Sequence, residues 1–233
     1  MIKKEIGFAL ECVSHLFFPK ICAGCGTDLR EEGIICAACI SDLPYTNFHM
    51  HTGNPVEKIF WGRVPLYSAF SMLFFHKHSV VRQLMHQLKY GGNRHVGMFL
   101  GNRMGELMLQ SNRYTNVQYI APLPLHPAKQ KIRGYNQAQI IATGISEVIN
   151  VPVEENLIRR ATKNETQTQK NRIERWNNMS GKFKAVKDAD LDKNHILLVD
   201  DVVTTGATLE ACASILVDMN AQVSVATAAY TTM

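Results

Sequence analysis

The chain has 233 residues, of which 46% are hydrophobic and 19% are charged, and its formal net charge is +5. These values are typical of a globular protein with a sizeable core, and they exclude a low-complexity or disordered chain. No stretch approaches the roughly 20 apolar residues that a membrane-spanning helix needs, so we expect no membrane span and a cytoplasmic protein.

The first 18 residues predict an amphipathic helix. Ile6, Leu10, Val13 and Phe17 fall on one face at helical spacing. Charged residues interrupt the apolar run and no small-residue cleavage site follows it, which argues against a signal peptide.

Two CxxC pairs, "CAGC" and "CAAC", follow this segment as Cys22, Cys25, Cys36 and Cys39. Each pair turns tightly enough to aim two thiolates at one point, so two pairs complete a tetrahedral S4 site. We interpret them as a structural zinc site, which is closed and performs no chemistry. Iron–sulfur ligation, disulfides and a redox role are the alternatives. We assign residues 1–45 to this zinc-ribbon-like module with its helix and residues 46–233 to a second domain.

The next part of the chain alternates between polar and periodic stretches. Residues 41–58 are polar and rich in Pro and Gly, and we interpret them as a linker. Residues 64–75 predict a strand, and helices are predicted over 79–90, where Gly91 and Gly92 follow, and over 95–110.

From residue 117 the pattern is one of strand, loop and helix units. Strands are predicted to begin at 117, 151, 196 and 221, helices over 138–150 and 209–219, and a basic loop over 129–139. Strands that alternate with helices imply a parallel sheet, so the fold class is α/β. Ligands of such sheets bind beyond the carboxyl ends of the strands.

The positive charge is concentrated in this half. Residues 126–184 hold 11 Lys and Arg against 5 Asp and Glu. This surplus indicates an anionic partner, either the phosphates of a small molecule or a nucleic-acid backbone, and a solvated basic face is the alternative. Residues 162–182 are polar and long for a connector, which favours a solvated helix or a functional loop.

The stretch "LLVDDVVTTGAT" at 197–208 combines an apolar strand, two adjacent carboxylates and a small-residue turn. A turn that opens a helix presents free N–H groups that suit a phosphate, and Gly206 lets the backbone come close. Asp200 and Asp201 can accept hydrogen bonds from sugar hydroxyls near that phosphate or act through Mg²⁺. A capped helix after a buried strand is the alternative, but it leaves two like charges side by side without a reason.

This stretch closely resembles the phosphoribosyl-pyrophosphate-binding motif of type I phosphoribosyltransferases. Other features resemble the ComF-type, competence-associated branch: the four-cysteine module, "LKYGGN" at 88–93, "PLPLHPAKQKIRGYNQAQ" at 122–139 and "TQTQKNRIERWNNMSGKF" at 166–183. The resemblance implies that the chain binds phosphoribosyl pyrophosphate with Mg²⁺ and transfers the phosphoribosyl group to a nitrogen nucleophile.

The resemblance also implies roles for individual residues. Asp200 and Asp201 would bind the ribose hydroxyls, and Arg133 and Gly134 would hold the pyrophosphate. Residues 162–182 would form a flap that closes over the site, with Lys163 and Arg172 supplying charge. Thr204, Thr205, Gly206, Ala207 and Thr208 would hold the 5-phosphate, and Val199 would also belong to the substrate-binding residues.

The acceptor of the phosphoribosyl group is not evident, so a second class of function stays open. A non-catalytic adaptor in DNA uptake would bind phosphoribosyl pyrophosphate or single-stranded DNA and would contact proteins of the competence machinery. The pattern leaves open whether the protein forms an oligomer.

Overall fold

The computed structural model describes residues 20–29, 33–160, 183–185 and 191–231. The helix predicted within residues 1–18 and the whole of the predicted flap, residues 162–182 with Lys163 and Arg172, lie outside these residues.

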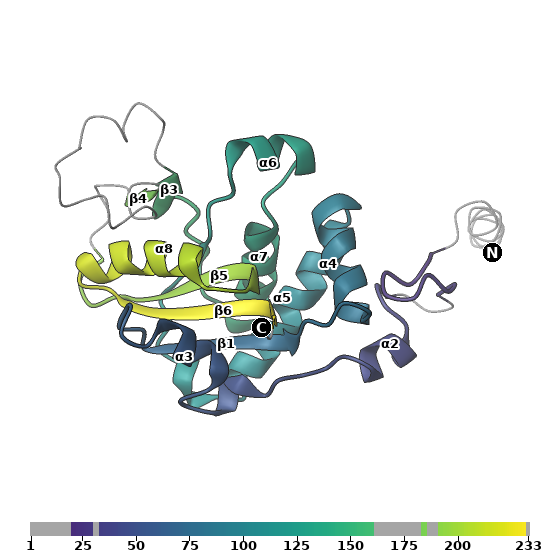
Figure 1. Ribbon diagram of the computed structural model, residues 1–233, viewed down its shortest axis with the longest axis horizontal. Helices are drawn as coiled ribbons and strands as arrows, with labels where there is room; N and C mark the ends of the chain where they lie inside the picture. Colours follow the sequence, from purple (N-terminus) through teal and green to yellow (C-terminus); the bar gives the residue numbers. More distant parts are fainter. Residues whose placement is uncertain (1–19, 30–32, 161–182, 186–190, 232–233) are drawn as a thin grey trace, which may run out of the picture.

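A four-stranded parallel sheet forms the core (Figure 1). Its strand order is β1-β6-β5-β2, and the strands span Ser68–Phe74 (β1), Gln222–Tyr230 (β6), His195–Val203 (β5) and Tyr119–Pro122 (β2). All three pairings are parallel, so the carboxyl ends of the four strands share one edge of the sheet. The predicted α/β fold class is therefore confirmed.

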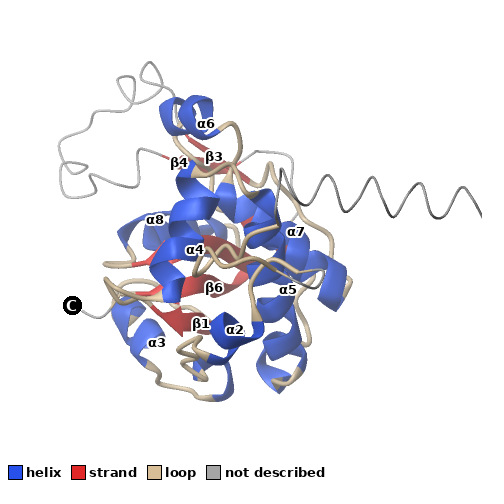
Figure 2. Ribbon diagram, turned by 90° about the vertical axis from the view of Figure 1, so that its right-hand side faces the viewer, coloured by secondary structure: helices blue, strands red, loops and turns tan. Residues whose placement is uncertain are grey.

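Helices cover both faces of the sheet (Figures 1 and 2). One face carries α5 (Arg94–Leu109) and α7 (Gln137–Ile149), and the other carries α8 (Ala207–Asp218) and α3 (Pro55–Phe60). In the turned view of Figure 2 the sheet lies between these two layers. The central strands β5 and β6 are thus enclosed on both faces, which explains their nearly continuous apolar sequences.

Small residues bring α5 and α7 into close contact. A methyl group at Gly101 would lie 2.2 Å from the carbonyl oxygen of Ile141 and 2.9 Å from Cα of Gly144. Only hydrogen fits at such a separation, so the glycines of these helices serve packing rather than flexibility.

The periodic stretches form the elements that were predicted for them. The 79–90 helix is α4 (Val80–Tyr90), where the side chain of Ser79 accepts a hydrogen bond from the N–H of Arg82 and Gly91 ends the helix. The apolar stretch at 64–75 contains β1, and the apolar residues 196–199 lie within β5. β5 continues to Val203, beyond the apolar residues 196–199, so Asp200 and Asp201 belong to the strand itself.

The linker predicted over residues 41–58 is wrong. This stretch contains a 3-10 helix, η1 (Phe48–Met50), and the start of α3. Buried Asn54 holds it together, because its amide donates to the carbonyls of Phe48, His51 and Ala69 while its Oδ1 accepts from the N–H groups that open α3. A single buried amide therefore satisfies backbone groups on both sides of a polar stretch that has no apolar periodicity.

The basic loop predicted over residues 129–139 is also wrong in its first half. It contains α6 (Pro127–Arg133), which begins at a proline in the first turn and ends at Gly134 with φ +76°. None of the side chains of α6 is buried, so the stretch shows no apolar stripe that periodicity could detect.

A second, two-stranded sheet is antiparallel and pairs β3 (Ile158–Arg160) with β4 (Phe183–Ala185). The strand predicted to begin at residue 151 is thus limited to three residues, and Val153 makes only an isolated bridge to Ile120.

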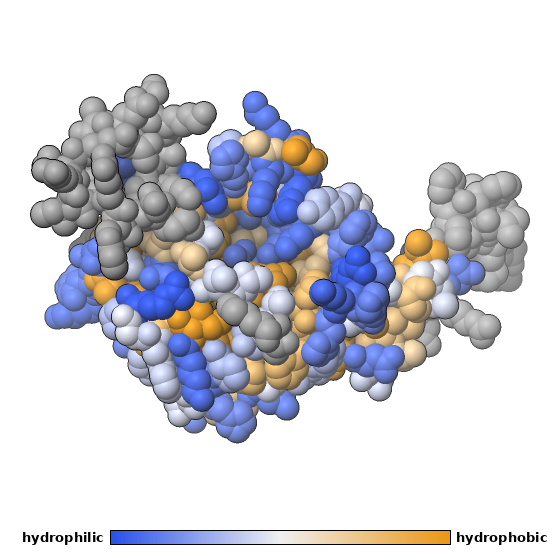
Figure 3. All heavy atoms as spheres, viewed as in Figure 1, coloured by the Kyte–Doolittle hydropathy of each residue, from blue (hydrophilic) through white to orange (hydrophobic). Residues whose placement is uncertain are grey.

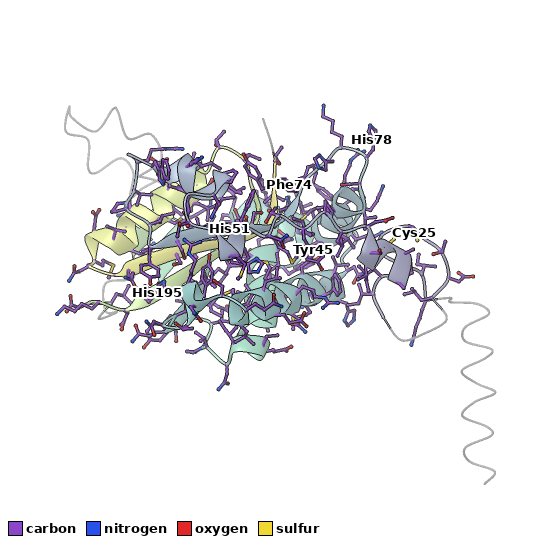
Figure 4. All side chains as sticks on the ribbon, turned by 90° about the horizontal axis from the view of Figure 1, so that it is seen from below. Cys25, Tyr45, His51, Phe74, His78 and His195 are labelled. Atoms are coloured by element: carbon purple, nitrogen blue, oxygen red, sulfur yellow. The ribbon has the colours of Figure 1, made fainter. Side chains whose placement is uncertain are left out.

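The four-cysteine segment packs against the sheet domain through α4. It contains α2 (Ala37–Ser41), and a methyl group at Gly24 would lie 2.9 Å from Cγ1 of Val80 and 2.9 Å from Sγ of Cys39. Cys25 lies at one end of the molecule and His195 at the other (Figure 4). The domain boundary at residue 45 stays a prediction, since buried residues on both sides of it belong to one hydrophobic cluster.

Within the residues that the structure describes, no helix is both long and apolar enough to cross a membrane. The remaining short helix, η2 (Asn112–Tyr114), leads from α5 into β2.

Candidate functional site

The sulfur atoms of Cys22, Cys25, Cys36 and Cys39 form one cluster, in which all four lie within 4.8 Å of one another. Sγ of Cys25 lies 3.7 Å from Sγ of Cys36. Zinc–sulfur bonds of about 2.3 Å place the sulfurs of a tetrahedron about 3.8 Å apart, whereas a disulfide needs about 2.05 Å. The four cysteines are not bridged, and their arrangement fits a zinc module.

Hydrogen bonds prepare this cluster for a cation. The N–H groups of Gly24 and Cys36 both donate to Sγ of Cys22. A contact of 2.9 Å with the hydroxyl of Thr27 lowers the pKa of Cys25 to about 6, while burial raises the pKa of Cys39. A bound metal would remove the cost of ionising the buried thiol, because metal ligation deprotonates cysteine outright.

We expect one tightly bound zinc ion for each chain. Replacing Cys36 by Ser should lower the zinc content of purified protein from about one ion per chain toward zero and loosen the packing of Gly24 against Val80. Elemental analysis gives the stoichiometry, and hydrogen exchange of α4 reports the packing. Cys212, which is buried in α8 and remote in sequence from the cluster, is the control, since its replacement by Ser should leave the zinc content unchanged. Wild-type protein without zinc would contradict the prediction.

A second candidate site lies where β5 leads into α8, at the carboxyl edge of the sheet. The intervening turn contains Thr204 and Thr205, which are exposed, and Gly206, which is buried and has φ +71°. Gly206 is the N-cap of α8 and no side chain caps the helix, so N–H groups of its first turn have no side-chain acceptor. Such a helix start suits an anion.

Asp200 and Asp201 precede this turn and differ in their surroundings. Burial, and then the charge of Asp201, raise the pKa of Asp200 to about 7, although the N–H of Asp201 donates to its Oδ1 at 2.8 Å. Asp201 forms an ion pair of 3.0 Å with Nζ of Lys89. Asp201 thus has a lysine partner, while the pKa of Asp200 is raised toward neutral pH.

Two cations from other elements face the acid pair. Lys89 comes from the last turn of α4 and Arg133 from the end of α6, and both act against the rise in the pKa of Asp200. The guanidinium of Arg133 lies 5.4 Å from the ring centre of Tyr90 and donates to the side chain of Gln137 at 2.7 Å. The structure therefore brings the predicted residues Arg133, Asp200 and Asp201 together.

Lys89 and Tyr90 were given no role from the sequence, although both belong to the "LKYGGN" stretch at 88–93. Their position at the end of a helix, just before two glycines, was the available signal. A third cation, Arg160, lies at the end of β3 and was not predicted as a site residue. It donates to the carbonyl of Pro124 at 3.3 Å, and its guanidinium lies 4.6 Å from the ring centre of Phe183. Arg160 thus supports the loop that follows β2.

Gly134, the other residue predicted to hold pyrophosphate, ends α6. This helix projects beyond the sheet, and its surface and that of α4 are mainly hydrophilic (Figures 1 and 3). Lys129 and Lys131 are exposed there. The predicted cation-rich surface is therefore present on α6, whereas Lys163 and Arg172 lie outside the described residues.

Comparisons with known proteins found similar sequences. The family described as phosphoribosyl transferase domain matches residues 133–231. Competence protein F of Haemophilus influenzae is 25% identical over 89% of this chain and 89% of its own length, and DNA utilization protein YhgH of Escherichia coli is 25% identical over 84% and 83%. Competence protein ComFC of Bacillus subtilis is 34% identical over 46% of this chain and 41% of its own length.

Among solved structures, a glutamine phosphoribosylpyrophosphate amidotransferase from B. subtilis, complexed with ADP and GMP, superposes with a TM-score of 0.42 at 16% identity. The match covers 61% of this chain and 30% of that one.

The parallel sheet, the acid pair before an uncapped helix and the matched domain define a type I phosphoribosyltransferase fold. The chain also has the four-cysteine cluster and is similar to proteins named for competence and for DNA utilization.

Proposed function

We propose that this protein binds phosphoribosyl pyrophosphate with Mg²⁺ and transfers its phosphoribosyl group to a nitrogen nucleophile, in a process linked to DNA uptake. The observation that carries the proposal is the contiguity of the acid pair with the uncapped start of α8. A sugar phosphate can bind to both features, because its ring hydroxyls donate to carboxylates and its 5-phosphate accepts from backbone N–H groups. The names of the relatives support the link to DNA uptake.

The proposed reaction depends on the stabilisation of charge and needs no covalent bond between the substrate and a side chain of the protein. The bond between C1 of the ribose and the pyrophosphate oxygen breaks, the sugar passes through an oxocarbenium-like state, and the nitrogen forms the new bond to C1. Mg²⁺, when bound with the substrate, would neutralise charge on the leaving pyrophosphate. Arg133 would add positive charge on that side, while Asp200 and Asp201 would hold the ribose hydroxyls and orient C1.

The decisive experiment is the release of pyrophosphate. Protein mixed with phosphoribosyl pyrophosphate, Mg²⁺ and a panel of nucleobases and amines should release pyrophosphate with at least one acceptor. An Arg133→Gln variant should release it at least about tenfold more slowly, because one charge-assisted contact contributes about 1.5–3 kcal/mol. Arg103, an arginine on α5 paired with Glu106, supplies the control substitution. Binding of the substrate without release by any acceptor would favour a non-catalytic role.

A second candidate function, binding of single-stranded DNA as an adaptor, has support from α6. This helix has no buried side chain and carries Lys129 and Lys131 on its surface. Relatives named DNA utilization proteins are consistent with a nucleic-acid partner.

A salt titration separates the two candidates. If α6 follows a DNA backbone, a Lys129→Ala, Lys131→Ala variant should reduce the slope of log affinity against log salt by about 0.7 for each phosphate that the variant no longer neutralises. The shift in melting temperature with phosphoribosyl pyrophosphate should remain that of the wild type. An unchanged slope would exclude α6 as a DNA-binding surface.

A further inference from the structure

The turn that precedes α8 rests on the end of α3. A Cβ at Gly206 would lie 2.7 Å from Cγ2 of Ile59 and 3.0 Å from the ring of Phe60. The backbone of the turn therefore packs directly on α3, a part of the chain more than 140 residues away in sequence and outside the 133–231 segment that matches the phosphoribosyl transferase domain.

Arg63, just beyond α3, connects these two elements. Its Nη1 donates to the carbonyl of Thr205 at 3.0 Å and to the carbonyl of Ile59 at 3.0 Å. Its Nη2 forms an ion pair with Glu210 in the first turn of α8. One guanidinium thus joins the end of α3, the turn and the start of α8.

The position of Glu210 creates an electrostatic conflict. A carboxylate in the first turn stabilises a helix through its dipole, but it also places negative charge where the proposed 5-phosphate would bind. The ion pair with Arg63 offsets that charge. The same guanidinium holds the carbonyl of Thr205, so that this oxygen is engaged with a donor rather than free to face the phosphate.

We propose that Arg63 is a positioning residue for phosphate binding, which fixes the turn at Thr205 and neutralises Glu210. The proposal rests on the proposed function, since it concerns the same phosphate. It adds a residue that lies between the stretch interpreted as a linker, 41–58, and the strand predicted over 64–75, and to which the sequence assigned no role. Arg63 acts through Thr205 and Glu210 and need not touch the ligand.

The test uses ribose 5-phosphate, with the dissociation constant measured by calorimetry on the full chain. We expect Arg63→Gln to raise this constant about tenfold, because Glu210 then stays uncompensated at the helix start. Arg63→Lys, which keeps the charge, should recover most of the affinity. The double variant Arg63→Gln, Glu210→Gln should also recover most of it, since the repelling charge is gone.

Arg113 supplies a matched control. It too donates to a backbone carbonyl, that of His51 at 2.9 Å, and forms an ion pair with a glutamate of α3, Glu57. Glu57 lies at the start of α3, at the other end of that helix from Arg63. Arg113→Gln should reduce the melting temperature to a similar extent or more without weakening ribose 5-phosphate binding.

The outcomes separate the two proposals. Wild-type protein that fails to bind ribose 5-phosphate would contradict the proposed function itself. Binding by the wild type and equal binding by Arg63→Gln would overturn only the role of Arg63. Loss of affinity that the double variant does not recover, or that Arg113→Gln shares, would show a merely structural contribution and would also overturn the proposal.

Discussion

Replacing both Asp200 and Asp201 by Asn is expected to abolish the rise in melting temperature that phosphoribosyl pyrophosphate and Mg²⁺ cause in the wild type. A ligand that binds only the native state at a hundredfold excess over its dissociation constant stabilises that state by about 2.7 kcal/mol. Asn offers one carbonyl oxygen and no charge, so it cannot hold two ribose hydroxyls as a carboxylate does. Thermal unfolding with and without ligand measures the effect.

The two acids should differ when they are replaced singly. Asp200→Asn should stabilise the ligand-free protein at pH 8, because it removes a buried charge that Asp201 repels. Asp201→Asn should not stabilise the ligand-free protein, because this change leaves Lys89 without its carboxylate partner. Asp218→Asn, a change at the exposed far end of α8, is the control and should alter neither stability nor the ligand shift. Equal ligand shifts in the wild type and the double variant would contradict the assignment of the acids.

The raised pKa of Asp200 also sets a pH dependence. Because this pKa rises from 3.8 to about 7 on folding, the native state binds the proton more tightly than the unfolded state does. Protonated Asp200 therefore contributes to the free energy of unfolding below about pH 4, and this contribution is lost as the pH rises to about 7. Asp200→Asn should remove that part of the dependence of stability on pH. Ligand affinity should change in the opposite direction and increase toward pH 7 and above, since the ribose hydroxyls need a carboxylate acceptor.

Gly101→Ala is expected to destabilise the fold by about 3 kcal/mol, or about 6–12 °C in melting temperature. The added methyl group would meet the carbonyl oxygen of Ile141 at 2.2 Å, and two helix backbones cannot separate without losing the packing between α5 and α7. Chemical denaturation at equilibrium gives the free energy of unfolding.

Gly97→Ala on the same helix is the matched control. Its methyl group would meet only side-chain atoms, Cγ2 of Ile140 at 2.6 Å, Cδ1 of Leu88 at 3.0 Å and Cβ of Ile140 at 3.1 Å, and no backbone atom is among these three nearest contacts. The gain of about 1 kcal/mol in helix propensity then offsets much of the crowding. Similar losses of stability in the two variants would contradict the inference that backbone atoms of α7 exclude a methyl group at position 101.

Short-range patterns in the sequence were sufficient for much of the fold and for the centre of the site. The apolar runs that form β1, β5 and β6 and the periodic α4, α5 and α7 are local signals, because each depends on residues a few positions apart. The two CxxC pairs and the acids before the TTGAT turn are likewise contiguous. Their chemistry could therefore be inferred from the residues that adjoin them.

Tertiary structure decided the features that depend on distant or isolated residues. Residues 41–58 fold because buried Asn54 bonds to three carbonyls, and nothing in the neighbouring sequence signals that burial. α6 was not predicted because a helix without a buried face has no apolar period. Lys89 reaches Asp201, and Arg63 reaches Glu210, across more than 110 and 140 residues of chain. Such ion pairs exist only once the sheet has set the positions of α3, α4 and α8, since side-chain charges interact through space and leave no trace in sequence spacing.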